Sequence, residues 1–426
     1  MGKNIVSRQV FPRLVTHLEA PEISVIVGPR QVGKTVLLQQ LKTHIVAKMA
    51  SAQDVYYFNL DIVTDRSIFH HQSDLIDFIR RRTGTNHKTY LLVDEAQRVT
   101  NPGLFFKGIY DLELPVKLIL TGSSALEIRS QMTEPLTGRK QVFQLFPLSF
   151  AEYLEAVEKD LLPYLTQPDM ISREKLLRHL DQFQLFGGYP KVVTTDNLEQ
   201  KSLYLEEIFT SYVEKDVVGF LRIKDAYVFS KFVKVVAQEV GNLFNIEKAS
   251  QELAIKHQTL KHYLDILEGT FVAERVPPYF HAARAEIRKM SKFYFLDPGI
   301  RNFARDGRDF FAKNPKERED RGSLLENFVF SELKKMELPR VCFWRTKDQA
   351  EVDFVLEKKG NLVPVEVKAT ALTTSAISRS FTSFITRYQP KLGVVVNLAL
   401  QAEKSVLGTE IHYLLPFELP EFINSL

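Results

Sequence analysis

The sequence predicts an α/β protein built from several domains. The chain has 426 residues, and at about 150 residues per domain this length favours roughly three domains. In residues 1–130, short apolar runs alternate with helical stretches, and polar or glycine residues follow each run. The runs are Ile23–Val27, Val55–Leu60, Tyr90–Val93 and Lys117–Thr121. This alternation predicts a parallel sheet that is covered by helices on both faces.

The composition is that of a folded protein rather than a disordered or membrane-spanning chain. Hydrophobic residues make up 45% and charged residues 25%, so the buried apolar surface can offset the entropy lost on folding. We expect no signal peptide and no membrane span, because no apolar run approaches about 18 residues. The single cysteine, Cys342, cannot form an internal disulfide, which favours a cytoplasmic location. The net charge of +4 is too small to indicate a nucleic-acid partner by itself.

Changes in pattern along the chain predict five segments. We expect a first domain over residues 1–145, a helical connecting region over 146–225, and a helical unit with a terminal strand pair over 226–304. A charge-rich segment at 305–321 is typical of a linker. Residues 322–426 return to alternating helices and strands, which indicates a second α/β domain.

A phosphate-binding motif follows the first apolar run. Its residues, Gly28-Pro29-Arg30-Gln31-Val32-Gly33-Lys34-Thr35, fit the pattern G-x-x-x-x-G-K-[ST] between a strand and a helix. The glycines let backbone N–H groups turn toward phosphates, and the helix amino terminus adds partial positive charge. We expect Lys34 to reach the β- and γ-phosphates of ATP and Thr35 to hold Mg²⁺. A glycine-rich turn with a chance Lys-Thr pair is disfavoured, because motif, strand and helix agree.

The third apolar run ends in two carboxylates, Asp94 and Glu95. Parallel sheets bind ligands at the carboxyl ends of their strands, so this pair is expected to face the nucleotide. Asp94 would hold the Mg²⁺ ion and its water shell, and Glu95 would orient and activate the attacking water. The alternative is an acidic cap on the following helix.

Three further residues are weaker candidates for the same site. Ser123 and Ser124 follow the fourth apolar run, where either could sense the γ-phosphate, although a helix cap is an equal alternative. Arg139 is a candidate arginine finger, a residue that stabilises transition-state charge and often comes from a neighbouring subunit. An ordinary surface arginine is the alternative.

These motifs resemble a large prokaryotic family of AAA-type ATPases that have a winged-helix middle region and a nuclease-like tail. The resemblance rests on G-P-R-Q-V-G-K-T, L-L-V-D-E-A-Q, L-T-G-S-S-A and L-T-G-R, followed by P-L-S-F-A-E-Y, and it covers nearly the whole chain. It implies the additional-strand class of P-loop ATPases, in which a glutamate such as Glu95 lies beside the metal-binding Asp94. It also implies self-association, with a hexamer as the expected assembly.

The middle region has the pattern of a helix-turn-helix unit. An apolar stripe on its second helix is formed by Leu260, Tyr263, Leu264 and Leu267. Residues that begin this helix and face outward are candidates for DNA contacts, namely Gln258, Thr259 and Lys261. A basic wing on DNA phosphates is the expectation for Arg284, Arg288, Lys289 and Lys292. The alternative is a packing module that serves contacts between domains or subunits.

The last domain carries a second group of candidate metal ligands. Two strands, Glu351–Leu356 and Leu362–Lys368, are expected to pair as a hairpin that brings Asp353 close to Glu366 and Lys368. Glu326 lies on a preceding amphipathic helix. Carboxylates such as Asp353 and Glu366 can hold Mg²⁺, and a nearby lysine can position the hydrolytic water.

This second group resembles the PD-(D/E)XK nuclease fold. Asp353, Glu366-Val367-Lys368 and Glu326 match the pattern, but Val352 stands where the pattern has proline. The resemblance implies an α/β nuclease-like domain. A domain of the same fold that contacts DNA or a protein partner without cutting is the alternative.

Together these features predict an ATP-hydrolysing, AAA-type ATPase that binds and remodels DNA, with branched or junction DNA as a candidate substrate. One alternative is a nucleotide-switched regulatory or defence protein whose last domain binds a partner without cutting DNA. A scaffold whose ATP site only holds the assembly together is the other.

Overall fold

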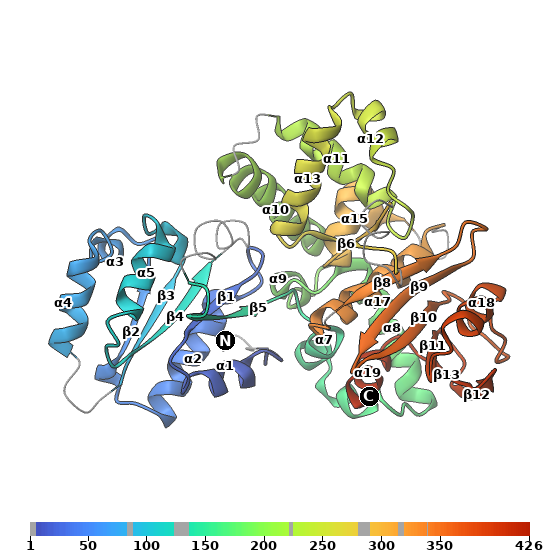
Figure 1. Cartoon of the computed structure of the whole chain (residues 1–426), viewed down its shortest axis with the longest axis horizontal. Helices are drawn as coiled ribbons and strands as arrows, with labels where there is room; N and C mark the ends of the chain where they lie inside the picture. Colours follow the sequence, from blue (N-terminus) through green and yellow to red (C-terminus); the bar gives the residue numbers. More distant parts are fainter. Residues whose placement is uncertain are drawn as a thin grey trace. The chain divides into compact units, whose positions relative to one another are not determined.

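The computed structural model describes residues 6–82, 88–122, 136–220, 225–279, 290–313, 319–338 and 340–426. The chain forms two compact units (Figure 1). The amino-terminal unit comprises Ile5–Phe146 together with Gly269–Phe271. The carboxyl-terminal unit contains Pro147–Glu268 and Val272–Leu426. The described part of the chain has no helix long and apolar enough to cross a membrane.

A parallel sheet with the strand order β2-β3-β4-β1-β5 is the centre of the amino-terminal unit. Its strands are β1 (Ile23–Val27), β2 (Val55–Asn59), β3 (Thr89–Asp94), β4 (Val116–Gly122) and β5 (Lys140–Gln144). The four predicted strands are confirmed, and β5 was not predicted. β4 lies between β1 and β3. β4 is thus the additional strand that the predicted fold class requires.

Helices cover this sheet, as the alternating pattern predicts. They are α1 (Phe11–His17), α2 (Lys34–Lys48), α3 (Val63–Ser67), α4 (Gln72–Arg82) and α5 (Pro102–Tyr110), with short 3-10 helices at Ala52–Asp54 and Ala96–Arg98. Every residue of β1 and β3 is buried, because a parallel sheet of this kind is covered on both faces. The carboxyl ends of β1, β3 and β4 therefore meet at one edge, where the loops after them can form a site.

The first part of the carboxyl-terminal unit is helical, as predicted. It contains α7 (Phe150–Val157), a 3-10 helix (Lys159–Leu165), α8 (Met170–Phe186), α9 (Pro190–Val193), α10 (Leu198–Ser211) and a π-helix (Tyr212–Phe220). The turn after α8 is a packing junction, because a Cβ atom on Gly187 would lie 2.2 Å from Asp297 Oδ1. The Asp297 carboxylate also accepts the Gly188 N–H at 2.7 Å, so only glycine fits here.

Three helices and two strands follow in the same unit. They are α11 (Ala226–Gln238), α12 (Ile246–Leu253), α13 (His257–Gly269), β6 (Ala273–Val276) and β7 (Lys292–Phe295). β6 and β7 pair antiparallel. α12 ends at a turn in which Ala254 has a φ of 52°, and the apolar stripe predicted for the second helix is buried on α13. The helical hairpin and strand pair thus have the order that the sequence predicted.

The segment predicted as a linker is partly helical. Its described residues include the end of α15 (Pro298–Asp306), all of α16 (Asp309–Ala312) and the start of α17 (Arg321–Lys335). Phe310 is 2% exposed, and Asp320 forms an ion pair with Arg301 at 2.6 Å. The charges that suggested a solvated linker instead pair with one another across these helices.

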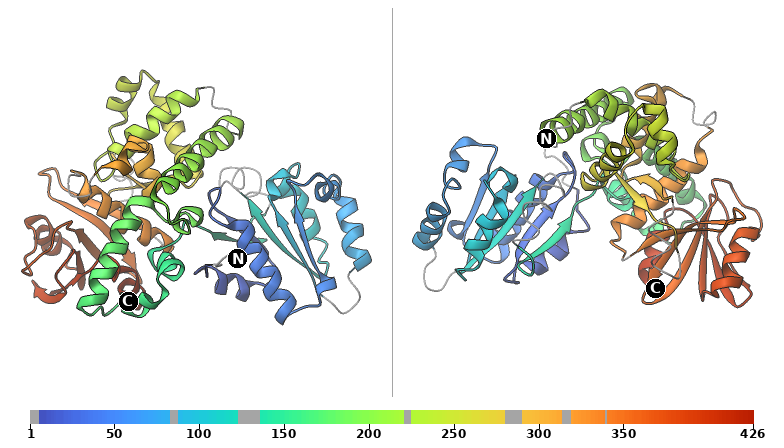
Figure 2. Two further views of the ribbon diagram at one scale, coloured as in Figure 1. Left: turned by 180° about the vertical axis from the view of Figure 1, so that it is seen from behind. Right: turned by 45° about the horizontal axis from the view of Figure 1, so that its top comes forward.

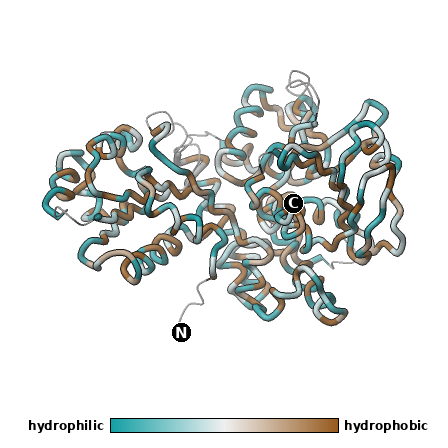
Figure 3. The backbone as a smooth tube through the Cα atoms, turned by 60° about the horizontal axis from the view of Figure 1, so that its bottom comes forward, coloured by the Kyte–Doolittle hydropathy of each residue, from teal (hydrophilic) through white to brown (hydrophobic). Residues whose placement is uncertain are grey.

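A mixed sheet completes the unit, with the order β12-β13-β11-β10-β9-β8. Its strands are β8 (Val341–Arg345), β9 (Glu351–Lys358), β10 (Asn361–Val367), β11 (Leu392–Val396), β12 (Ala402–Val406) and β13 (Thr409–Leu414), with helices α18 (Arg379–Tyr388) and α19 (Leu419–Ser425). β9 and β10 form the predicted antiparallel hairpin. Figure 2 shows this sheet from two further sides. Hydrophobic and hydrophilic stretches alternate along the described parts of the chain (Figure 3).

Candidate functional site

The loop between β1 and α2 has the backbone geometry of a phosphate cradle. Gly33 has a φ of 98° and Gln31 a φ of 63°, and this left-handed region is costly for residues other than glycine. A Cβ atom on Gly28 would lie 2.1 Å from the carbonyl oxygen of Leu145. Gly28 is therefore required where the chain after β5 passes the loop, a reason that the motif alone does not reveal.

Lys34 is the first residue of α2, and its ammonium lies over the loop. Its Nζ donates hydrogen bonds to the carbonyl oxygens of Gly28 and Pro29, each at 2.8 Å, and the residue is 6% exposed. Both acceptors are neutral. Charge-assisted hydrogen bonds to phosphate are stronger, so an anionic triphosphate is a better partner for this amine than the loop itself.

The phosphate loop and the acidic strand meet through one hydrogen bond. The Thr35 hydroxyl donates to Asp94 Oδ2 at 2.7 Å, although the two residues are 59 positions apart. A hydroxyl and a carboxylate side by side are hard oxygen donors of the kind Mg²⁺ prefers, so Thr35 and Asp94 fit the predicted metal. When bound there with ATP, the ion would neutralise charge on the phosphates.

Two residues that the sequence did not single out complete the surroundings of Asp94. Thr121 on β4 donates its hydroxyl hydrogen to Asp94 Oδ1 and accepts the backbone N–H of Glu95 at 3.1 Å. Tyr57 on β2 donates to Asp94 Oδ2 at 3.1 Å. Burial, followed by the negative charge of Asp94, raises the pKa of Tyr57 to about 12, so its hydroxyl remains a donor.

Glu95 follows β3 in a strained conformation, with a φ of 58°. Strain of this kind costs about 1–3 kcal/mol and gathers at functional sites. Its carboxylate accepts a hydrogen bond from Gln97. Burial raises the pKa of Glu95, and the nearby charge of Lys34 opposes this effect. A carboxylate with a raised pKa is better matched to proton transfer near neutral pH than an exposed one.

Arg8 is a further residue that sequence reasoning missed. It is 7% exposed, and its guanidinium donates to the carbonyl oxygens of Val32 at 2.9 Å and Phe146 at 2.6 Å. By donating to the Val32 carbonyl oxygen, Arg8 stabilises the conformation of the phosphate loop. An arginine 20 residues before the motif gives no local signal of this contact.

Arg139 lies at the opposite edge of the sheet. Its carbonyl oxygen accepts the N–H of Ile23, the first residue of β1, at 2.9 Å. Its guanidinium pairs with Asp111 at 2.7 Å. Arg139 therefore lies beside the first residue of β1, whereas the phosphate loop follows the last residue of that strand. Ser123 and Ser124 lie outside the described residues.

In the carboxyl-terminal unit the predicted carboxylates do gather around the β9–β10 hairpin. Asp353 Oδ2 accepts the backbone N–H of Val367 at 2.7 Å, and Glu366 pairs with Lys368 at 2.7 Å. Burial and then the charge of Glu326 raise the pKa of Asp353 to about 8. The sequence therefore predicted correctly that these side chains lie together.

A lysine from β7 occupies this group of carboxylates. Lys292 Nζ lies 2.6 Å from Glu351 Oε1 and 3.2 Å from Glu326 Oε1, and its side chain is 1% exposed. The prediction that Lys292 forms part of a DNA-facing wing is therefore wrong, because its ammonium is enclosed. The ammonium pairs with Glu326 and Glu351, whereas the predicted ligands Asp353 and Glu366 contact the Val367 N–H and Lys368. Arg284, Arg288 and Lys289 lie outside the described residues.

The other residues predicted to touch DNA begin α13. Gln258 and Lys261 are exposed and Thr259 is half-buried. They lie on the outward side of the helix whose opposite side carries the buried stripe.

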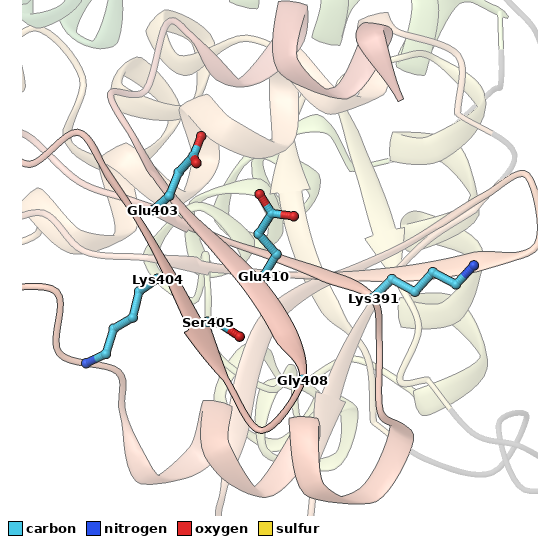
Figure 4. A pocket seen from close by; sticks show the side chains of 6 residues that line it. All are labelled: Lys391, Glu403, Lys404, Ser405, Gly408 and Glu410. Atoms are coloured by element: carbon cyan, nitrogen blue, oxygen red, sulfur yellow. The ribbon is translucent and has the colours of Figure 1, made fainter.

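A third group of titratable residues lies on the edge hairpin of the mixed sheet. Glu403 and Glu410 project from the same side of β12 and β13 (Figure 4), and His412 lies 3.4 Å and 3.1 Å from their respective oxygens. The two carboxylates are exposed. The trio is explained as a surface ion-pair group.

Three families match separate stretches of the chain. Residues 20–154 match a family described as an AAA domain. Residues 177–309 and 321–418 match two families described as a domain of unknown function (DUF8612) and a domain of unknown function (DUF4143). Together with the strand order and the loop geometry, the first match shows that the amino-terminal unit is an AAA-type P-loop domain.

Relatives of similar length occur in distant prokaryotes. An uncharacterized protein of Haemophilus influenzae is 26% identical over 379 residues, covering 86% of this chain and 88% of the relative. An uncharacterized protein of Mycobacterium tuberculosis is 25% identical over 391 residues, covering 90% and 78%. One of Methanocaldococcus jannaschii is 25% identical over 364 residues, covering 83% and 75%. The similarity thus extends across both units.

The solved structures with some similarity to this chain include two with a bound nucleotide or analogue. The Aeropyrum pernix ORC2 protein in its ADP form has a TM-score of 0.34 at 14% identity, covering 63% of this chain and 84% of that chain. DnaA of Aquifex aeolicus bound to AMPPCP has a TM-score of 0.28 at 16% identity, covering 61% and 86%. Likeness at this level carries no argument about what this chain does.

Proposed function

We propose that the protein hydrolyses ATP in its amino-terminal unit and uses the energy to rearrange DNA. The hydrogen bond between Thr35 and Asp94 carries the first part of this proposal. It joins the phosphate loop to the acidic strand, so a triphosphate on the loop would have its metal and its attacking water beside Asp94 and Glu95.

Each residue of the site has a distinct role in the proposed reaction. The loop N–H groups and Lys34 bind the phosphates, and Thr35 and Asp94 hold the metal. Glu95 orients the attacking water and accepts its proton. Thr121 positions both acidic residues, since its one hydroxyl contacts Asp94 and the Glu95 backbone.

The DNA part of the proposal is supported by the helical hairpin of α12 and α13. Three helices followed by an antiparallel strand pair are the order of a winged-helix unit, and the exposed start of α13 carries Gln258 and Lys261. In helix-turn-helix proteins the residues at the start of the second helix contact base edges.

Assembly would complete the ATP site. Arg139 lies at the edge of the sheet that is remote from its own phosphate loop, so it can serve only the site of a neighbouring subunit. A ring, with a hexamer as the expected form, would place such an arginine at each site.

ATPase measurements with defined DNA would test this function. The purified protein would be assayed without DNA and with single strands, duplexes and four-way junctions, each over a series of salt concentrations. We expect DNA to stimulate hydrolysis, with an affinity that falls steeply as salt rises. Hydrolysis that no DNA changes, together with a stable protein partner, would instead support a nucleotide-switched regulator.

The enclosed ammonium of Lys292 favours one part of that second function. A nuclease-like domain whose carboxylates already hold a cation would contact DNA or a partner without cutting. The enclosed ammonium thus favours a last domain that binds without cutting. Such a domain is compatible with ATP-driven DNA rearrangement and with a regulatory switch.

A further inference from the structure

The carboxylate group around the β9–β10 hairpin contains nearly as many positive as negative side chains. Four carboxylates gather there, from Glu326, Glu351, Asp353 and Glu366. Three cations pair with them, because Lys292 contacts Glu326 and Glu351, Arg345 contacts Glu351 at 2.7 Å, and Lys368 contacts Glu366 at 2.7 Å. The charge that would attract a divalent ion is already largely balanced by the protein.

We infer that Lys292 is the resident cation of this group, and that the group is an internal ion-pair lock between β7 and the mixed sheet rather than a divalent-metal site. This inference is independent of the ATP chemistry proposed above. It assigns Lys292, Tyr294, Glu326 and Glu351 a shared role in joining the β6–β7 strand pair to the mixed sheet.

Lys292 and its partner Glu326 have further close neighbours. The Tyr294 hydroxyl donates to Glu326, and a Cβ atom on Gly241 would lie 3.0 Å from Glu326 Oε2. The aromatic ring of Phe343 lies 5.5 Å from Lys292 Nζ, within the range of a cation–π contact. The Lys292 ammonium thus lies between the carboxylates of Glu326 and Glu351 and the ring of Phe343.

A metal ion that displaced the Lys292 ammonium from the carboxylates would leave this ammonium without a partner in the protein interior. Lys292 is 1% exposed, and a buried charge that loses its partner is strongly destabilising. Asp353 is also engaged, because one of its oxygens accepts the Val367 N–H. A divalent ion would therefore have to replace existing contacts at several of its ligands at once.

Other hydrogen bonds join the same elements, as a lock requires. The Asn327 side chain on α17 accepts the Phe295 N–H at 2.8 Å and donates to the Phe295 carbonyl at 3.2 Å. The segment after β6 runs beside β8, where Phe343 N–H donates to Pro277 at 3.0 Å and Tyr279 N–H donates to Phe343 at 2.6 Å. The strand pair and the mixed sheet are thus one continuous packed body.

Counting bound Mn²⁺ on the full chain without nucleotide, by electron paramagnetic resonance, tests the inference. We expect the wild-type protein and Asp353→Asn to bind the same number of Mn²⁺ ions. Lys292→Met, which removes the ammonium and keeps an apolar side chain, should gain one Mn²⁺ per chain, and adding Asp353→Asn should abolish it. Lys334→Met is the matched control, because Lys334 pairs with Glu274 at 2.5 Å in the same unit but outside the group.

Two outcomes would overturn the inference. One is a wild-type Mn²⁺ site that Asp353→Asn removes, since the group would then bind metal despite Lys292. The other is a folded Lys292→Met protein that binds no more Mn²⁺ than the control. If Lys292→Met does not fold, the double variant Lys292→Met/Glu351→Gln takes its place, because it removes one charge of each sign. The number of Mn²⁺ ions bound by the wild-type protein tests the inference whether or not these variants fold.

Discussion

Replacing Thr121 by valine removes one hydroxyl and keeps the shape of the side chain. In the structure that hydroxyl donates to Asp94 and accepts the N–H of Glu95 at 3.1 Å, and Asp94 is 1% exposed. A hydrogen bond to a charged group contributes about 1.5–3 kcal/mol and a neutral one about 0.5–1.5 kcal/mol. We therefore expect Thr121→Val to lower the opening free energy of the amino-terminal unit by about 2–4 kcal/mol.

Thr89 on the neighbouring strand offers a matched control. Its side chain is 1% exposed, and among the described residues its hydroxyl oxygen has no hydrogen-bond partner. Thr89→Val removes a buried hydroxyl that contributes no hydrogen bond, so it should be neutral or stabilise the unit by about 1 kcal/mol. The same substitution thus has opposite expected effects at two buried positions of adjacent strands.

Native-state hydrogen exchange of the β3 and β4 amides measures both effects, because it reports the opening of one unit even when two units unfold separately. ATPase assays on the same proteins should show a lower kcat for Thr121→Val, since Glu95 loses the contact that holds its strained backbone. Equal exchange rates in the two variants, or a Thr121→Val protein as stable as the wild type, would refute the role assigned to this hydroxyl.

Three further predictions concern the proposed ATPase and DNA contacts. Because burial raises the pKa of Glu95 and a general base must be ionised, kcat should fall as pH drops through a pKa above the ordinary 4.5, and a pH–rate profile without this limb would contradict the role. Lys261→Glu should weaken DNA binding and lower the slope of log affinity against log salt by about 1. Lys48→Glu makes an equal charge change on α2 and should alter neither the affinity nor the slope. Equal effects of the two substitutions would argue against a DNA contact by α13. Arg139→Ala should lower ATPase activity by about 10³-fold or more, and mixing it with Lys34→Ala subunits should restore part of that activity; a fully active Arg139→Ala protein would exclude an arginine finger.

Local patterns predicted the amino-terminal sheet well. The phosphate loop and the first four strands are short continuous segments whose residue types determine their structure. The polar strand β5 escaped prediction, because Lys140–Gln144 contains only two apolar residues and is strand-like only through its pairing with β1.

Contacts across the sheet could not be predicted in the same way. Thr121 and Tyr57 reach Asp94 because β3 lies between β4 and β2, with Val93 opposite Leu120 and Asn59 opposite Asp94. Strand order and register are tertiary properties that one sequence does not specify. The available signal was a polar residue near the carboxyl end of β3 and of β4, namely Asp94 and Thr121.

The role of Lys292 shows a different limit. Its position among basic residues suggested a surface wing, yet it shares one strand face with Tyr294, and both side chains reach Glu326. A lysine that alternates with a tyrosine on an otherwise apolar strand was a signal for a buried ion pair. Only the fold shows that a helix 34 residues later supplies its partner.

Equilibrium binding and single-turnover hydrolysis of ATP, measured on the same preparations, test the nucleotide site most directly. Wild-type protein should bind and hydrolyse ATP, Glu95→Gln should bind it with similar affinity but hydrolyse it about 10²–10⁴-fold more slowly, and Lys34→Ala should not bind it. Retained binding by Lys34→Ala, or wild-type turnover by Glu95→Gln, would contradict the assignment of the loop and the acidic strand to ATP hydrolysis.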